Sequence, residues 1–252
     1  MKFIHLSDLH IHTHDDDNTD VSAMLNFVSA RYPDHRLIVT GDIADDGAVK
    51  QYEKAYALLQ PFKNKIFICP GNHDFGAAGN FYSHERALRF DEILAKRLNQ
   101  GGTFKGDSTP VVNVLRDGST EIMLIALDSN LETQHPFDFA CGEIGESQLS
   151  ALNTVLATTQ RMGMVKVLLF HHHPFMVNDP FMELKDARAL ASTIYGRVDL
   201  VLFGHKHEMK QWEKRWGTKY MLASDNSPGK KFAKEITIDG TGISVTSVPI
   251  TA

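Results

Sequence analysis

Residues 66–74 read Ile-Phe-Ile-Cys-Pro-Gly-Asn-His-Asp, an apolar run followed directly by a turn and three polar side chains. A short apolar run bounded by Pro and Gly predicts a strand that is buried on both faces. Asn72, His73 and Asp74 would then stand at the carboxyl end of that strand, where open α/β sheets bind their ligands. The segment therefore predicts both a class of fold and the place of a functional site.

The rest of the chain extends this segment into a sheet. Further apolar runs that predict strands lie at residues 2–6, 37–40, 111–115, 121–127, 165–170 and 200–203. Helical stripes of apolar residues lie between them, at residues 21–28, 49–59, 149–156 and 187–194. This alternation predicts βαβ units and a largely parallel sheet. After residue 208 the helical pattern ends, and strand-like segments with Gly-containing turns predict an antiparallel meander.

Both halves fit one α/β architecture, a four-layer αββα sandwich in which two mixed β-sheets pack together and helices flank them. The chain contains no internal repeat, low-complexity block or Pro/Ser-rich linker. We therefore expect a single domain over residues 1–252, with residues 209–250 as its C-terminal β-meander. Residues 75–110 contain a predicted helix at 81–98 and a Gly-rich loop, and they form a candidate substrate-facing insertion.

The composition argues against several classes of protein. The chain has 26 Lys and Arg against 31 Asp and Glu, a net charge of −5 without a basic tract, so no nucleic-acid partner is expected. No apolar run approaches the ~20 residues that span a bilayer, and the first residues reach a charge too early for a signal peptide. Two Cys are too few for a disulfide framework. We expect a cytoplasmic protein without a membrane partner.

Potential metal ligands follow five of the predicted strands. They are Asp8 and His10, then Asp42, then Asn72, then the triplet His171-His172-His173, and finally His205 and His207. Because ligands bind outside the carboxyl ends of the strands, we expect these side chains to converge. Carboxylate, amide and imidazole ligands suit Mn, Fe, Zn, Co or Ni ions rather than Ca, and they are too many for one tetrahedral ion. Each motif occurs by chance on its own, but five together indicate two divalent metal ions.

The five motifs resemble the signature blocks of the calcineurin-like metallophosphoesterase superfamily: Asp8-x-His10, Gly41-Asp42, Gly71-Asn72-His73-Asp74, His172-His173-Pro174 and Gly204-His205-x-His207. The resemblance spans residues 8–207. It implies that one metal is held by Asp8, His10, Asp42 and His207. It also implies that Asp42 bridges to a second metal, which Asn72, His172 and His205 complete. In the family, the first His of the His-His-Pro ending is the metal ligand, and in this triplet that residue is His172.

The same resemblance implies two catalytic residues. His73 would act as general acid or electrostatic stabiliser of the phosphoryl or leaving-group oxygen. Asp45 occupies the place where related phosphatases carry an Asp that pairs with that His; the alternative is a solvated loop carboxylate. His5, within the first predicted strand, reads as a core histidine, and Lys230-Lys231 reads as a solvated turn.

The resemblance implies a dinuclear metal-dependent phosphoric ester hydrolase that attacks small phosphodiesters with a metal-bound hydroxide. The amino-acid sequences of the motifs most resemble those of bacterial cyclic-nucleotide and glycerophosphodiester phosphodiesterases. A phosphomonoesterase and a DNA-repair-type nuclease of the same superfamily are the alternatives, and a non-catalytic protein-binding scaffold is a third. All ligand positions are present, which disfavours the scaffold.

Aromatic and basic residues in residues 75–110 bear on the choice of substrate. They are Phe75, Phe81, Tyr82, Arg86, Arg89 and Phe104. They could supply stacking surface and positive charge beside a phosphoryl group. The alternative is a helix that only covers the sheet, with its arginines in solvent.

Overall fold

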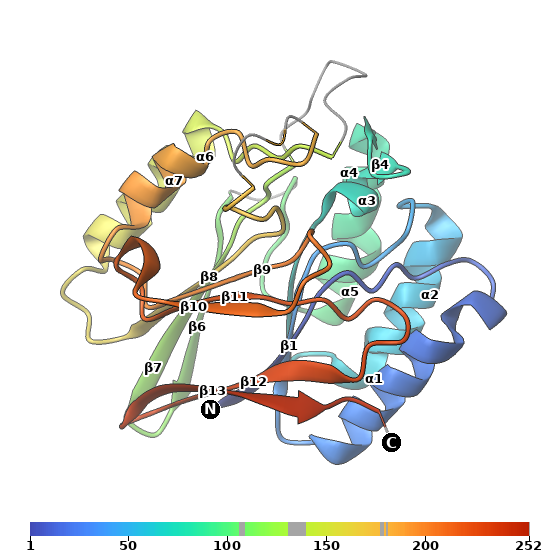
Figure 1. Cartoon of the computed structure of the whole chain (residues 1–252), viewed down its shortest axis with the longest axis horizontal. Coiled ribbons are helices and arrows are strands. Elements are labelled where there is room, and N and C mark those ends of the chain that lie inside the picture. Colours follow the sequence, from blue (N-terminus) through green and yellow to red (C-terminus); the bar gives the residue numbers. More distant parts are fainter. Residues whose placement is uncertain (106–108, 131–139, 177–178, 180, 252) are drawn as a thin grey trace.

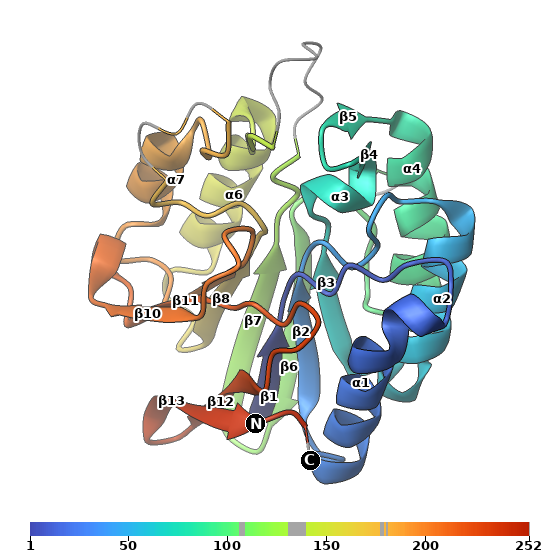
Figure 2. The same cartoon turned by 45° about the vertical axis from the view of Figure 1, so that its right-hand side comes forward.

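The computed structural model describes residues 1–105, 109–130, 140–176, 179 and 181–251. Two β-sheets lie face to face in the middle of the molecule, and helices cover the outer face of each (Figures 1 and 2). This arrangement confirms the predicted α/β sandwich of two mixed sheets with flanking helices. No helix within the described ranges is both long enough and apolar enough to cross a bilayer.

The first sheet has the strand order β13-β12-β1-β2-β3. Its strands are β1 (Lys2–Leu6), β2 (Arg36–Thr40), β3 (Ile66–Cys69), β12 (Phe232–Asp239) and β13 (Gly242–Pro249). β1, β2 and β3 run parallel, whereas β12 is antiparallel to both of its neighbours. The loops that follow β1, β2 and β3 therefore leave the sheet at one end.

The second sheet has the strand order β10-β11-β9-β8-β7-β6. Its strands are β6 (Val111–Asp117), β7 (Thr120–Ala126), β8 (Val165–Leu169), β9 (Leu200–Phe203), β10 (Lys210–Glu213) and β11 (Tyr220–Ala223). The four central strands run parallel, and β10 and β6 pair antiparallel at the two edges. The loops after β8 and β9 likewise leave at one end of the sheet.

Alternate residues of the second sheet face two different hydrophobic clusters. In β7, Ile122 and Leu124 pack with the strands of the first sheet, whereas Met123 and Ile125 pack with α6 (Glu146–Thr158) and α7 (Ala187–Ile194). α1 (Thr19–Arg31) and α2 (Val49–Leu59) contribute to the first cluster from the opposite side. Because successive strand residues point to opposite faces, one strand joins two layers of core. His5 lies fully buried in β1, as the sequence predicted.

The last strands differ from the predicted meander over residues 209–250. β10 and β11 belong to the second sheet, where β11 lies parallel to β9, while β12 and β13 form a hairpin in the first sheet. The prediction of one continuous meander is therefore wrong, since the chain crosses between sheets at residues 224–231. Met221 and Leu222 explain the position of β11, because a strand buried on both faces suits a sheet interior.

Within residues 75–110, the helix predicted at 81–98 starts at His84, after a small hairpin, and ends at Leu98. β4 (Gly76–Ala77) pairs with β5 (Phe81–Tyr82), and α3 (Asn72–Phe75) precedes them. A helical stretch then runs through α4 (His84–Arg89), a π-helical turn η3 (Phe90–Ala95) and α5 (Lys96–Leu98). Single turns of 3₁₀-helix complete the elements: η1 (Asp16–Asn18), η2 (Gln60–Phe62) and η4 (Arg215–Gly217). Gly106, at the end of the Gly-rich loop, lies outside the described residues.

Candidate metal centre

The loops after β1, β2, β3, β8 and β9 meet at one end of the sandwich. Backbone hydrogen bonds tie the first two loops together: the amide of Asp8 donates to the carbonyl of Gly41 at 3.1 Å, and that of His10 donates to the carbonyl of Asp42 at 2.9 Å. Gly71 lies so close that a β-carbon there would stand 2.2 Å from Oδ1 of Asp42. The predicted convergence of the strand ends is therefore a feature of the structure.

Ligand atoms form three overlapping clusters, each with its atoms within 4.8 Å of one another. The clusters are Asp8, His10 and His207; His10, Asp42 and His73; and Asp42, His171 and His205. His10 and Asp42 each belong to two clusters. Every predicted ligand except Asn72 and His172 thus appears in a cluster, and Asn72 lies beside one of them.

Asn72 faces two imidazoles of the third cluster. Its Oδ1 atom lies 3.1 Å from Nε2 of His171 and 3.1 Å from Nδ1 of His205. Nε2 of His171 also lies 3.2 Å from Oδ2 of Asp42 and 3.3 Å from Nδ1 of His205. An amide oxygen, a carboxylate and two imidazole nitrogens therefore face one another at the distances of a small coordination sphere.

Backbone carbonyls fix which nitrogen of each imidazole is free. Nδ1 of His171 donates to the carbonyl of Thr40 at 2.7 Å, and Nε2 of His205 lies 3.2 Å from the carbonyl of Met182. Because a carbonyl can only accept, the opposite ring nitrogens are left for a ligand. This use of the second nitrogen is typical of metal-binding histidines.

His172 lies outside the clusters, contrary to the expectation from the His-His-Pro ending. Its Nδ1 atom lies 2.8 Å from Oγ of Ser129, and its ring packs so closely on Gly142 that a β-carbon there would stand 2.2 Å from Cγ of the ring. Burial lowers the pKa of His172 well below its usual range. The ring that faces Asp42 and Asn72 is that of His171, one residue earlier, because β8 ends at Leu169.

Charges in the third cluster are strongly coupled. Burial opposes ionisation of Asp42, yet the adjacent His171 holds the pKa of that carboxyl well below its usual range. Burial likewise disfavours a charged His171, but Asp42 overcomes it and raises the pKa of His171 to about 9. A proton on His171 thus balances the charge of Asp42 in the metal-free protein. Since metal ligands must be deprotonated, a divalent ion would displace it.

The first cluster contains a nitrogen atom that lacks a partner. Nε2 of His10 is buried without a hydrogen bond to any described residue, and it lies 3.9 Å from Oδ2 of Asp42. The rings of His10 and His207 stack with centroids 5.3 Å apart. A buried polar atom without a partner is costly, and a metal ion would satisfy it. The donor set therefore fits divalent metal.

His73 and Asp45 meet in a different way from the one expected. Nδ1 of His73 donates to the backbone carbonyl of Asp45 at 2.7 Å, while the carboxylate is 3.9 Å away. That carboxylate lies closer to Nδ1 of His10 and of His12, at 3.3 Å in each case. Its hydrogen bond with His10 lowers the pKa of Asp45. The Asp45 side chain therefore orients His10 rather than His73.

Asp74 has a structural role that sequence reasoning did not assign. Its carboxylate accepts hydrogen bonds from the amides of Ile43 (3.1 Å), Ala44 (2.8 Å) and Gly71 (2.9 Å), which fixes the loops that carry Asp42 and Asn72. Burial raises the pKa of Asp74 to about 7. The presence of a carboxylate within Gly71-Asn72-His73-Asp74 was the available signal.

Most of the candidate ligands have a left-handed backbone conformation. Positive φ angles occur at Asp8 (59°), His10 (45°), Asp42 (49°), His205 (76°) and His207 (50°). Such angles are uncommon for residues other than Gly, and they concentrate at functional sites. The backbone turns sharply at each strand end, and these turns direct the ligands inward.

A family model for calcineurin-like phosphoesterases matches residues 1–209. The chain belongs to the calcineurin-like phosphoesterase family. This confirms the resemblance seen in the five motifs. The family consists of metallophosphoesterases, which use divalent metals, and the ligand clusters of this calcineurin-like phosphoesterase agree with that chemistry.

Curated relatives of this calcineurin-like phosphoesterase carry phosphodiesterase names. A "Probable cyclic nucleotide phosphodiesterase" of Rhodococcus erythropolis is 31% identical over 217 residues, which cover 81% of this chain and 64% of the relative. A 3',5'-cyclic adenosine monophosphate phosphodiesterase of Haemophilus influenzae is 24% identical over 179 residues, which cover 68% of this chain and 54% of the relative. The matched part is thus less than two thirds of either relative.

Solved structures share the fold of this calcineurin-like phosphoesterase. A dimetal phosphatase from Danio rerio superimposes with a TM-score of 0.71, 15% identity, and coverage of 100% of this chain and 99% of that one. A purple acid phosphatase from yellow lupin gives a TM-score of 0.64 and 11% identity, over 99% of this chain and 51% of that one. At these identities the likeness shows the architecture alone.

Proposed function

We propose that this protein is a dinuclear metal-dependent hydrolase of small phosphodiesters. The observation that carries the proposal is the position of Asp42, whose carboxylate belongs to two ligand clusters at once. One of these clusters adds His10 and His73, and the other adds His171 and His205. A carboxylate between two sets of ligands is the arrangement that a closely spaced metal pair needs.

The proposed first site consists of Asp8, His10, Asp42 and His207. The proposed second site consists of Asp42, Asn72, His171 and His205, with His171 in the place first given to His172. The mixed oxygen and nitrogen ligands suit Mn, Fe, Zn, Co or Ni. Two such ions would supply Lewis acidity and positive charge for the attack of water on phosphorus.

His73 is the proposed proton donor to the leaving oxygen. The carbonyl of Asp45 holds one proton on Nδ1 of the ring, so the transferable proton is on Nε2 of the imidazolium form. The backbone amide of His73 also donates to Oδ1 of Asp42 at 3.0 Å, which fixes the ring beside the proposed metal pair. Asp45 contributes to this role through its backbone and to metal binding through His10.

Residues 75–110 supply one wall of a cavity of about 470 Å³. Tyr82, Phe104 and Lys105 line it from this segment, and residues 143–148 line it from the opposite side. Gly142, against which His172 packs, directly precedes the second wall. We propose that this cavity receives the ester group of the substrate, which makes 75–110 the substrate-facing part of a single domain.

The lining of the cavity favours an uncharged organic group. The amine of Lys105 lies 2.7 Å from Oδ2 of Asp128, so its charge is already balanced, and Glu143 and Glu146 add negative charge. A second phosphate would be repelled there, whereas an aromatic or polar neutral group would pack against Tyr82. The cyclic nucleotide phosphodiesterase names of the relatives support the same choice of a diester.

Two features support a small substrate and a reducing compartment. The net charge is −5, which does not favour a polyanionic nucleic acid. The chain has only two Cys, Cys69 and Cys141, and both are buried; so few cysteines are usual for proteins of the reducing cytoplasm. We therefore propose a cytoplasmic enzyme that acts on small molecules.

A substrate panel with defined metal loading tests the proposal. Metal-free protein is reconstituted with Mn, Fe, Zn, Co or Ni and assayed on a bis-aryl diester, an aryl monoester, cyclic AMP, glycerophosphodiesters and single-stranded DNA. We expect diester hydrolysis that saturates at two metal equivalents. Preference for the monoester would indicate a phosphomonoesterase, and preference for DNA a nuclease. A protein that binds two metals and hydrolyses none of these substrates would contradict the proposal.

A further inference from the structure

The segment 224–231 connects the two sheets and passes beside His207. It is fixed to the end of β1: the amide of Ser7 donates to Oδ1 of Asn226 at 3.1 Å, and the amide of Asn226 donates to the carbonyl of Ser7 at 2.9 Å. Oγ of Ser224 donates to the same Oδ1 atom at 2.9 Å. Ser7 directly precedes Asp8, so this segment is held in register with the first ligands.

Asp225 is a buried carboxylate within this segment, with its side chain 1% exposed. Its Oδ1 atom lies 3.6 Å from Nδ1 of His207 and accepts hydrogen bonds from the amide (3.1 Å) and hydroxyl (2.7 Å) of Ser227. Its Oδ2 atom lies 2.6 Å from Nζ of Lys230. A buried carboxylate is costly unless it is paired. The hydrogen bonds from Ser227 and the ion pair with Lys230 stabilise the charged form of Asp225.

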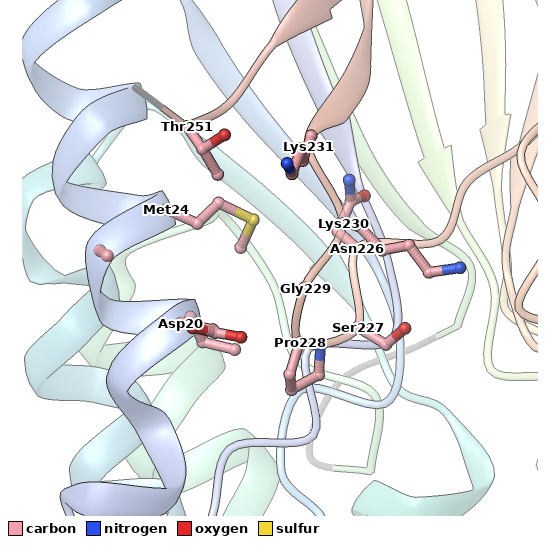
Figure 3. A pocket seen from close by; sticks show the side chains of 11 residues that line it. Asp20, Met24, Asn226, Ser227, Pro228, Gly229, Lys230, Lys231 and Thr251 are labelled. Atoms are coloured by element: carbon pink, nitrogen blue, oxygen red, sulfur yellow. The ribbon is translucent and has the colours of Figure 1, made fainter.

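Lys230 is directed toward Asp225 and not into the nearby cavity. That cavity, about 200 Å³ in volume, lies between α1 and the segment, with Met24 on one wall and Pro228 on the other (Figure 3). Although Lys230 belongs to its lining, the side chain extends away from α1 (Figure 3). Lys230 and Lys231 are exposed and follow a turn, as the sequence predicted, and Lys230 in addition pairs with Asp225 while 46% of its side chain stays exposed.

Two other candidate ligands show the same arrangement around Nδ1. Nδ1 of His171 donates to the carbonyl of Thr40, and Nδ1 of His10 lies 3.3 Å from Oδ1 of Asp45. In each case an acceptor on Nδ1 leaves Nε2 for the ligand cluster. His207 has Asp225 in the corresponding place, with Nδ1 as the ring atom that faces it.

We propose that Asp225 is a positioning residue, which keeps the proton of His207 on Nδ1 and leaves Nε2 of His207 free for metal. Lys230 partly neutralises the negative charge of Asp225. The inference rests on the proposed metal centre. An acceptor on the second nitrogen fixes the orientation of a ligating imidazole and increases its basicity, and loss of such a partner costs about 10–100-fold in metal affinity. Lys230 offsets part of the negative charge that Asp225 places beside the site.

The test measures Mn²⁺ binding and the tautomer of His207 in the full-length protein. Asp225→Asn keeps the shape and the Oδ1 acceptor but removes the charge. We expect one of its two Mn²⁺ affinities, measured by competition with a chromophoric chelator, to fall about 10–100-fold while the other is unchanged. In the metal-free protein, ¹⁵N NMR should show a shift of His207 from the Nδ1-protonated toward the Nε2-protonated form. Lys230→Met should change the same affinity in the opposite direction.

Asp239→Asn is the matched control. Asp239 also accepts hydrogen bonds from the amide and hydroxyl two residues later, in Thr241, but it is the last residue of β12 and its hydrogen bonds go to the β12–β13 turn rather than to a candidate metal ligand. This variant should leave both affinities and the His207 tautomer unchanged.

Three results would overturn the inference. They are a wild-type Mn²⁺ affinity in Asp225→Asn, an equal loss at both sites, and a lower melting temperature of the metal-free variant without any change in the affinity or the tautomer. A wild-type protein that binds no Mn²⁺ or other divalent ion would instead refute the metal centre itself.

Discussion

The Nδ1 atom of His171 donates a 2.7 Å hydrogen bond to the carbonyl of Thr40, and this bond joins the ends of β8 and β2, which belong to different sheets. The proposed second metal site is built across the same interface. Asp42 and Asn72 come from the first sheet, and His171 and His205 come from the second. The relative position of the two sheets therefore determines whether the four ligands meet.

Alanine substitutions in the triplet distinguish the two candidate ligands. His171→Ala should lower the bound metal from two equivalents to about one, because Asp42 and Asn72 lose their shared imidazole partner. His172→Ala is the control, since it removes an equally buried ring that contacts Ser129. Metal content after dialysis is the measurement. Greater metal loss in His172→Ala would restore the assignment from the His-His-Pro ending.

Asp42→Asn should abolish both tight metal binding and turnover. The amide keeps the size of the side chain but loses the charge that is shared between two ligand clusters. Metal content and diester hydrolysis are measured on the same preparation. Asp46→Asn, in the same loop but outside the clusters, should retain two equivalents and activity. Normal turnover of Asp42→Asn with two bound metals would rule out the bridging role.

His73→Asn should keep both metals and reduce kcat by about 10²–10⁴, as for the loss of a positioned acid. Asp45→Asn should act differently, because its carboxylate contacts His10 while its carbonyl still holds His73. We expect weaker metal binding in that variant and additive effects on kcat at saturating metal in the double mutant. Non-additive effects would show that the Asp45 carboxylate works through His73 after all.

The stability of the fold should depend on His5 below pH 6.5. Burial, aided by Lys234, lowers the pKa of His5 to about 3. The unfolded chain binds a proton below pH 6.5 while the folded protein does not, so the free energy of unfolding falls as pH decreases from 6.5 toward 3. Between pH 6.5 and 5 this residue should account for about 2 kcal/mol.

Urea unfolding of the metal-free protein at pH 7 and pH 5 checks this dependence. His5→Gln should show a smaller loss of stability on acidification than the wild type, because glutamine does not titrate. His14→Gln, at an exposed position, is the control and should behave as the wild type. Equal pH dependence in all three proteins would exclude His5 as the source.

The 470 Å³ cavity should control the choice of substrate. Tyr82→Ala removes an aromatic wall and should change the ratio of diester to monoester turnover while both metals remain bound. Arg86→Ala is the control: it lies in the same segment but does not line the cavity. An unchanged ratio in Tyr82→Ala, or an equal change in Arg86→Ala, would show that residues 75–110 serve only to cover the sheet.

Local patterns were sufficient to predict the layers of this fold. The apolar runs at 2–6, 66–69 and 200–203 coincide with β1, β3 and β9, because buried strands need continuous apolar residues. The convergence of ligands followed from their place at strand ends. These features depend on only a few neighbouring residues.

Features set by distant contacts could not be predicted in the same way. The choice between His171 and His172 depends on which ring reaches the carbonyl of Thr40, which lies 131 residues before His171 in the chain. The position of β11 beside β9 depends on burial of both faces by the fold as a whole. Asp225 meets His207 only because the chain crosses between sheets immediately after β11.

The left-handed backbone at Asp8, His10, Asp42, His205 and His207 has a consequence for how this chain can change over generations. Each such angle costs a residue with a side chain about 1 kcal/mol relative to glycine. Selection for stability alone would therefore replace these residues, and selection for chemistry must retain them. A duplicated copy freed from its reaction should diverge first at these positions, and it would become more stable as it lost its activity.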